Sequence, residues 1–257
     1  MDLIDTHAHI YLSDFEVDRG QILQEAQAQN IKHILLPHID SQTTQALLQL
    51  AEQYPDICRA MIGLHPCSVK ANFEQELSHV TRQLAQRPNS FCAIGEIGTD
   101  LYWDTTFFEQ QKEAFRFQIG LAKEYHLPIV IHCRNSIHET IALLQTCFFQ
   151  GLKGVFHCFS GDLAQAQTII EMGFYLGIGG VATFKNGGLD KVLPHIPLTS
   201  LVLETDSPYL APVPYRGKRN QPAYLPIIAQ KVADFQKVSL AEVAQVTTQN
   251  AIQLFGL

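Results

Sequence analysis

Eight short apolar runs rich in Val, Ile and Leu recur along the chain and constrain its fold more than any other feature. They lie at residues 3–9, 33–39, 58–65, 91–97, 128–133, 154–158, 175–181 and 201–206. Longer segments with helical periodicity lie between several of them and after the last, at 43–53, 73–86, 107–124, 136–149, 163–172 and 240–254. Nearly continuous apolar strands are typical of a parallel sheet that helices cover on both faces. With 257 residues in total, the chain matches the usual size of a (β/α)8 barrel, about 250 residues. We therefore predict one α/β domain over residues 1–257, a single TIM barrel that is distorted in places. An open doubly wound sheet is the alternative.

Polar residues that can bind a metal end most of these apolar runs. In a (β/α)8 barrel the active site lies at the C-terminal ends of the strands, so the residues that close each run are the candidates. These residues are His7 and His9, His65, Glu96, His132, His157 and Asp206. A single His in an apolar strand is more often a hydrogen-bonded core residue, but the convergence of so many favours a metal site.

Six of these residues suit a site for two divalent ions. His65 aside, they supply four imidazoles and two carboxylates, more ligands than one tetrahedral ion can use. Two ions about 3.5–4 Å apart can share them if one carboxylate bridges. We assign His7, His9 and Asp206 to one ion and His132 and His157 to the other, with Glu96 shared. Mg, Mn and Zn all fit this donor set.

Two further carboxylates, Asp5 and Glu204, precede His7 and Asp206 by two positions. On a strand that spacing places them on the same inward face, one layer deeper. There they would orient imidazoles or support a metal-bound water, and Glu204 is the closer of the two to the chemistry. For Asp5, simple burial with a backbone partner is an equal alternative.

The net charge of −7 disfavours broad adhesion to nucleic acid, so any attraction for phosphate has to be local. Local basic residues are present in the loops predicted after the strands, at Lys70, Arg134, Lys185, Arg216, Lys218 and Arg219. We favour Arg134 and Arg216 as phosphate contacts because guanidinium matches phosphate in bidentate geometry. Lys70 and Arg219 are expected to be ordinary solvated charges. Further candidate contacts to a phosphate or a leaving group are His65 and Asn220.

Aromatic residues also fall in or beside these loops, and about two of them are expected to stack on the bases of a single strand. The candidates are Tyr102, Trp103, Phe159, Phe184, Tyr209 and Tyr215. A Pro-rich stretch over 207–222 predicts a long, stiff loop after the eighth strand.

The chain has no stretch that approaches the roughly 20 apolar residues of a membrane span, and it does not begin with a signal-peptide pattern. Its six cysteines show no C-x-x-C spacing and are expected to be reduced. We therefore expect a cytoplasmic protein without a membrane partner, and no obligate protein partner is evident.

Five segments in order along the chain resemble the TatD family of metal-dependent deoxyribonucleases. They are Asp-Thr-His-Ala-His at 5–9, Gly-Leu-His-Pro at 63–66, Gly-Glu-Ile-Gly-Thr-Asp at 95–100, Phe-His-Cys-Phe-Ser-Gly at 156–161 and Glu-Thr-Asp-Ser-Pro-Tyr-Leu-Ala-Pro at 204–212. The resemblance implies a barrel, a dinuclear site at the six ligands named above, and hydrolysis of DNA phosphodiesters, in several members from a 3′ end. It also implies that Asp206 contacts the attacking water. Thr99 departs from the pattern, which has Leu at this position, and this questions local packing more than catalysis.

The resulting hypothesis is a metal-dependent deoxyribonuclease, a 3′–5′ exonuclease that acts on single-stranded or frayed DNA ends. Asp206, Glu96 and Glu204 are its predicted catalytic residues. One alternative is a small-molecule ester or amide hydrolase of the wider amidohydrolase superfamily, and another is a D-aminoacyl-tRNA deacylase. A non-catalytic metal-binding scaffold is the alternative outside the enzymes, although such a scaffold usually lacks one or more ligands and none is missing here.

Overall fold

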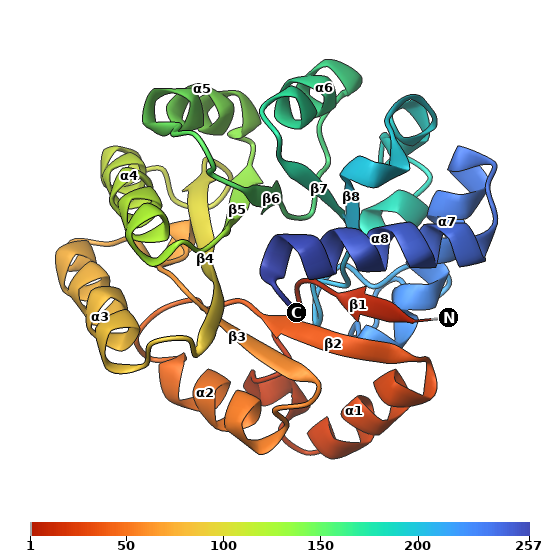
Figure 1. Ribbon diagram of the computed structural model, residues 1–257, viewed down its shortest axis with the longest axis horizontal. Coiled ribbons are helices and arrows are strands. Elements are labelled where there is room, and N and C mark those ends of the chain that lie inside the picture. The colour runs from red at the N-terminus through yellow and green to blue at the C-terminus, as the bar shows by residue number, and fades with distance from the viewer. Residues whose placement is uncertain (1) are drawn as a thin grey trace.

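The computed structural model describes residues 2–257 and contains the predicted barrel. Neighbouring strands pair in parallel in the order β1 to β8, and helices alternate with them around the outside (Figure 1). The strands are β1 (Leu3–Asp5), β2 (Ile31–Leu36), β3 (Cys58–Ile62), β4 (Phe91–Asp100), β5 (Ile129–Arg134), β6 (Gly154–Phe156), β7 (Tyr175–Ile178) and β8 (Leu201–Leu203). The α-helices are α1 (Arg19–Ala28), α2 (Thr44–Gln53), α3 (Phe73–Gln86), α4 (Phe108–Tyr125), α5 (Ile137–Cys147), α6 (Leu163–Glu171), α7 (Leu225–Gln236) and α8 (Leu240–Phe255).

The barrel closes between β8 and β1 through backbone contacts that lie mostly past the ends of both strands. Thr6 N donates to Leu203 O at 3.0 Å, Asp206 N to His7 O at 2.8 Å, and His9 N to Ser207 O at 2.7 Å. The closure is therefore nearly complete but irregular, as the prediction of a distorted barrel allowed. It also fixes the backbone that carries three of the predicted ligands.

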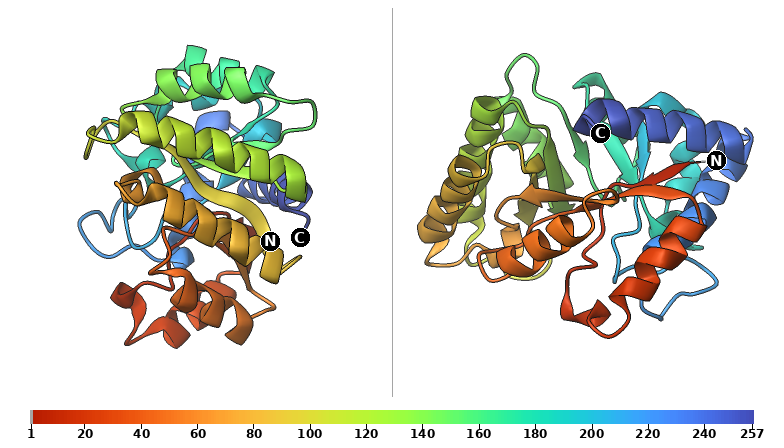
Figure 2. Two further views of the ribbon diagram at one scale, coloured as in Figure 1. Left: turned by 90° about the vertical axis from the view of Figure 1, so that its left-hand side faces the viewer. Right: turned by 60° about the horizontal axis from the view of Figure 1, so that its bottom comes forward.

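An apolar plug fills the barrel below the candidate site. One side chain from each of seven strands forms this cluster: Ile4, Leu35, Met61, Ala93, Val130, Val155 and Val202. Tyr175 of β7 packs against them, and Ala251, Leu254 and Phe255 of α8 complete the cluster. Helix α8 crosses the N-terminal end of the barrel, on the side where both chain ends lie (Figures 1 and 2). Because this end is filled, polar side chains can converge only at the opposite, C-terminal ends of the strands.

Several predicted element boundaries were wrong. Strand β1 ends at Asp5, so His7 and His9 follow the strand and do not lie on it, whereas β4 runs on to Asp100. The predicted helices did not include α1 or α7. Helix α1 is largely polar and buries only Ile22, Leu23 and Ala26, so the helical periodicity of its apolar residues is weak. Helix α7 has a proline in its first turn, and in the sequence this proline looks like a continuation of the Pro-rich loop before it. Within residues 2–257, no helix has both the length and the apolar character that a membrane crossing requires.

Candidate metal centre

The predicted ligands converge around a cavity of about 750 Å³ at the C-terminal ends of the strands. Five of the six line this cavity: His9, Glu96, His132, His157 and Asp206. His7 is fully buried beside them, with its ring stacked on that of His157 at a centroid distance of 3.9 Å. Glu96 lies within β4 and His132 within β5, whereas the other ligands lie in the loops directly after β1, β6 and β8.

Glu96 stands at the middle of the cluster, and its two carboxylate oxygens face different histidines. Oε2 lies 3.1 Å from His7 Nε2 and 3.6 Å from His9 Nε2. Oε1 lies 2.8 Å from His132 Nδ1 and 2.7 Å from His157 Nε2. One buried carboxylate therefore joins two separate histidine pairs.

Asp206 belongs to the side of the cluster that holds His7 and His9. Its Oδ1 lies 3.8 Å from His7 Nε2 and 3.7 Å from His9 Nε2. Four sets of donor atoms among the described residues are close enough to hold a metal ion, and three of them consist of the predicted ligands alone: His7 with His9 and Glu96, Glu96 with His132 and His157, and His7 with His157 and Asp206. The fourth is His65 with Cys67 and His132.

The donor set fits a divalent cation. Although His7 is buried, neither of its ring nitrogens makes a hydrogen bond to any residue that the structure describes. An unpartnered buried nitrogen is costly, and a cation held by the lone pair of Nε2 and the facing carboxylates would remove that cost at Nε2.

The charges of the cluster are strongly coupled. Burial acts to raise the pKa of Glu96, but His157, His65 and His7 outweigh it and hold that pKa well below its usual range. Burial acts to lower the pKa of His157, but Glu96 and Glu204 raise it well above the ordinary value. Burial raises the pKa of Asp206 to about 7 against the opposing effect of His7 and His157. Protons bound to the cluster thus offset the negative charge of its carboxylates, and a cation that binds there would displace those protons.

Comparison with known proteins decides the family. A family model described as TatD related DNase matches residues 4–256. The chain belongs to the TatD family. It is 37% identical over 256 residues to the uncharacterized metal-dependent hydrolase YabD of Bacillus subtilis, covering 99% of each protein. It is 32% identical over 263 residues to the 3′-5′ ssDNA/RNA exonuclease TatD of Pectobacterium parmentieri, covering 99% of this chain and all of that protein. The crystal structure of YjjV, a TatD homologue from Escherichia coli, superposes with a TM-score of 0.93 at 31% identity and covers 99% of this chain and 98% of YjjV.

Carboxylates support the histidines of this TatD-family chain from behind. Asp100 Oδ2 lies 2.8 Å from His132 Nε2, and Glu204 Oε1 lies 3.4 Å from His157 Nδ1. Asp5 accepts hydrogen bonds from the backbone N–H of Thr205 at 2.9 Å and of His7 at 3.3 Å. For Asp5 these backbone contacts match the alternative that the sequence left open, burial with a backbone partner. The contact of Asp100 was not predicted. The sequence feature that could have indicated the Asp100 contact is a carboxylate at the end of β4, because β4 pairs with β5, the strand that carries His132.

His65 reaches the cluster from the loop after β3. Its Nε2 lies 3.3 Å from Glu96 Oε1, and its Nδ1 accepts a hydrogen bond from the backbone N–H of Cys67 at 3.0 Å. Because Nδ1 accepts, the ring carries a proton at Nε2, the nitrogen that faces the cavity. This geometry makes His65 a hydrogen-bond donor toward the cavity.

The two arginines that the sequence favoured are both exposed and lie over aromatic rings. The guanidinium of Arg134 lies 3.9 Å from the ring centroid of Tyr102, and that of Arg216 lies 4.0 Å from the centroid of Phe184. Within residues 2–257, neither forms an ion pair with a carboxylate. Their N–H groups therefore remain available to an anionic ligand.

Other polar loop residues have partners inside the protein. Lys70 pairs with Asp104 at 2.7 Å, and Arg219 pairs with Asp18. Asn220 is fully buried and donates its amide N–H groups to Thr205 O and Tyr209 O, both at 2.7 Å, and its Oδ1 accepts from Gln221 N at 2.9 Å. Asn220 thus holds the loop that carries Asp206 and has no free donor for a substrate, which differs from the predicted contact.

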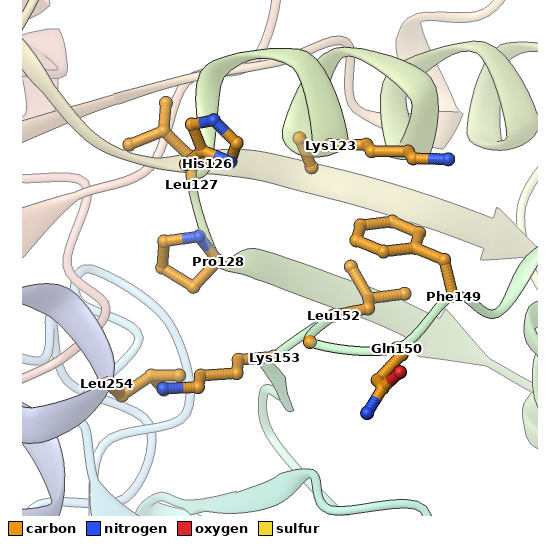
Figure 3. A pocket seen from close by; sticks show the side chains of 11 residues that line it. Lys123, His126, Leu127, Pro128, Phe149, Gln150, Leu152, Lys153 and Leu254 are labelled. Carbon is orange, nitrogen blue, oxygen red and sulfur yellow. The ribbon is translucent and has the colours of Figure 1, made fainter.

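A smaller cavity of about 300 Å³ lies away from these ligands, near the starts of β5 and β6 (Figure 3). Lys123, His126, Phe149 and Lys153 are among the residues that line it. Because it opens near the N-terminal ends of the strands, it is no part of the candidate metal centre.

Proposed function

We propose that this TatD-family protein is a divalent-metal-dependent 3′–5′ exonuclease that hydrolyses phosphodiester bonds of single-stranded DNA. The observation that carries the proposal is the position of the Glu96 carboxylate, whose two oxygens face two different histidine pairs. A carboxylate placed between two such pairs could be shared by two metal ions, and two ions held close together suit phosphodiester hydrolysis. The name of the Pectobacterium relative, a 3′-5′ ssDNA/RNA exonuclease, supports this substrate class.

In this proposal His7, His9 and Asp206 would hold one divalent ion and His132 and His157 would hold the other, with Glu96 shared between the two. Mg, Mn and Zn are the candidates, and bound ions would acidify water and neutralise charge on the phosphate. Glu204 Oε1, which lies 3.4 Å from His157 Nδ1, would orient that imidazole.

The protein's own groups then position the reacting atoms. Asp206 orients the attacking water and accepts its proton. The water oxygen forms a bond to phosphorus as the bond from phosphorus to the 3′ oxygen breaks. The leaving 3′ oxygen takes up a proton from solvent water, which gives a new 3′-hydroxyl and releases a nucleoside 5′-phosphate. His65 Nε2–H donates to a phosphate oxygen, and Arg134 and Arg216 attract the phosphates of the strand.

Nuclease assays with Asp206→Asn and a matched control test the proposal. Protein stripped with a chelator is reloaded with Mg²⁺, Mn²⁺ or Zn²⁺ and given a single strand labelled at its 5′ end. The wild type should shorten the strand from the 3′ end only when metal is restored. Asp206→Asn should retain much of its metal and lose about 100-fold or more of the rate, whereas the exposed control Asp190→Asn should match the wild type. No metal-dependent shortening with any ion would refute the nuclease.

A substrate panel separates the neighbouring chemistries. RNA strands, small esters, amides and lactones, and D-aminoacyl-tRNA are assayed beside DNA. Release of an amino acid without strand cleavage, or turnover of small esters alone, would replace the proposed activity with a different hydrolase reaction.

A further inference from the structure

We infer that Trp103, with Tyr102 and Arg134 beside it, is the platform on which the protein stacks the nucleobase next to the scissile phosphate. This inference rests on the proposed nuclease function. It adds the feature that makes the site selective for unpaired ends, because a base in a duplex is already stacked and paired and cannot reach such a platform.

The platform is exposed in the cavity that holds the metal ligands. Trp103 is 67% exposed and Tyr102 is 50% exposed, which is unusual for side chains that normally bury most of their apolar surface. Trp103 also lines the 750 Å³ cavity together with Glu96 and His132. A large exposed indole at the rim of a phosphate-binding site offers a stacking surface that any base can use.

Asp100 fixes the platform relative to the metal ligands. Its Oδ1 accepts the backbone N–H groups of Tyr102 at 2.8 Å and of Trp103 at 2.9 Å. Its other oxygen, Oδ2, lies 2.8 Å from His132 Nε2. One buried carboxylate therefore sets both the turn that carries the aromatic rings and the orientation of a predicted ligand.

Arg134 supplies the charge that a nucleotide needs. It lies two residues after His132, and its guanidinium contacts both rings, 3.9 Å from the Tyr102 centroid and 5.3 Å from the Trp103 centroid. The rings themselves meet edge to face at 4.9 Å. A guanidinium held on aromatic faces and without an ion-pair partner within residues 2–257 keeps its N–H groups ready for a phosphate oxygen.

A second aromatic wall lies across the cavity. Tyr209 is 51% exposed, lines the same cavity, and lies after β8, four strands away from β4 in the barrel order. Its ring centroid is 5.9 Å from that of His9. The predicted metal ligands thus lie between Trp103 on one side of the cavity and Tyr209 on the other. A DNA strand that crosses the cavity would place a base on Trp103 and the phosphate of that nucleotide over the ligands.

The other candidate aromatic side chains are not available to a base in the cavity. Phe159 is 1% exposed, and Tyr215 stacks on Tyr224 at 4.2 Å. Phe184 is only partly exposed and is not among the residues that line the 750 Å³ cavity. The structure thereby reduces the six aromatics of the sequence to Tyr102, Trp103 and Tyr209, and Trp103 is the most exposed of these.

Trp103 is the only tryptophan in the chain, so intrinsic fluorescence reports this one position. Wild-type protein loaded with Mg²⁺ is titrated with a thymidine oligonucleotide whose phosphorothioate linkages resist hydrolysis. Binding should quench the fluorescence with this strand, and much less with a strand of equal length whose last three residues lack bases or with a blunt duplex. Equal quenching by the baseless strand would overturn the inference.

Kinetics with Trp103→Ala and Trp103→Phe give a second readout. Loss of the stack should raise KM for single-stranded DNA by about 5- to 150-fold with kcat little changed, and Phe should restore most of the affinity. On a strand that ends in a baseless residue, wild type and Trp103→Ala should behave alike. Phe117→Ala, which removes a 45% exposed ring from the outer face of α4, is the control and should match the wild type.

The two proposals fail in different ways. If wild type cleaves DNA with metal but Trp103→Ala has the same KM, the platform is wrong and the nuclease stands. If wild type cleaves no nucleic acid, the nuclease is wrong, and the fluorescence titration alone decides whether a base binds at Trp103.

Discussion

Replacing Asp100 with Asn would reverse the proton position on His132, and the structure shows why. Asp100 Oδ2 lies 2.8 Å from His132 Nε2, while Oδ1 accepts the backbone N–H groups of Tyr102 and Trp103. Asn in this place would keep its oxygen on the two N–H groups and turn its NH2 group toward His132. Since an amide NH2 cannot accept a hydrogen bond, Nε2 would have to accept, and the ring proton would move to Nδ1. Nδ1 is the nitrogen 2.8 Å from Glu96 Oε1, and it would lose the lone pair with which it is proposed to bind a cation.

The expected cost follows from the loss of an oriented ligand. Removing the partner that orients a metal-bound histidine lowers metal affinity by about 10- to 100-fold, which corresponds to about 1.4–2.7 kcal/mol. Calorimetric titration of chelator-treated protein with Mn²⁺ or Zn²⁺ should show this loss in the site that uses His132, with a much smaller change in the site that uses His7.

Asp104→Asn is the matched control for this experiment. Asp104 follows four residues later, has a partly exposed side chain, and pairs with Lys70 at 2.7 Å, so its loss should leave metal affinity unchanged. Thermal unfolding of both variants checks that the turn after β4 is intact. Wild-type affinity at every site in a folded Asp100→Asn protein would refute the argument that Asp100 sets the proton position on His132.

Three further outcomes are expected. His7→Ala and His132→Ala should each lose about one metal equivalent by elemental analysis, and from different sites, since they face different oxygens of Glu96; loss of all metal from both would contradict separate sites. Gly98→Ala should destabilise the protein by about 3 kcal/mol or more in denaturant unfolding, because a Cβ there would lie 2.0 Å from His132 O at a φ of +141°. Gly120→Ala, with nothing within 4 Å on an exposed face of α4, should instead stabilise it by about 0.5–1 kcal/mol, and equal effects of the two changes would refute the steric reasoning. Burial lowers the pKa of His38 from 6.5 to about 4, so the unfolded chain takes up this proton first and stability should fall by about 3 kcal/mol as pH drops from 6.5 to 4. His38→Asn should reduce that slope, and an unchanged pH profile of unfolding would contradict it.

The sequence predicted the barrel and the convergence of the ligands because both follow from local patterns. Apolar runs identify strands, and in a parallel barrel the polar residues that end those runs must meet at one rim. The prediction that the first strand extends to His9 was nevertheless wrong, because β1 ends at Asp5. The two rings still converge, at a centroid distance of 5.1 Å, since backbone contacts to Asp206 and Ser207 hold the segment after the strand.

Loop contacts could not be predicted in the same way, because they depend on how distant turns meet. Asn220 donates to Thr205 O across fifteen residues, a contact that no periodicity signals. Asp100 ends β4, and its contact to His132 depends on the register between β4 and β5, in which Gly98 pairs with His132. Residue type and position at the ends of the apolar runs therefore predicted which side chains converge, whereas the groups that orient those side chains and hold the loops required the structure.

The position of Asp100 links metal binding and base recognition while leaving them separable by mutation. Asp100→Asn should keep the acceptor for the turn that carries Trp103, so this variant should lose metal affinity and kcat but retain quenching of Trp103 by single-stranded DNA. Trp103→Ala should do the reverse and raise KM while metal affinity stays at the wild-type level, because the indole contacts no predicted ligand through a hydrogen bond. If each variant changed both metal affinity and base binding, the two functions would not be separable, and the assignment of metal orientation to Asp100 and base stacking to Trp103 would be wrong.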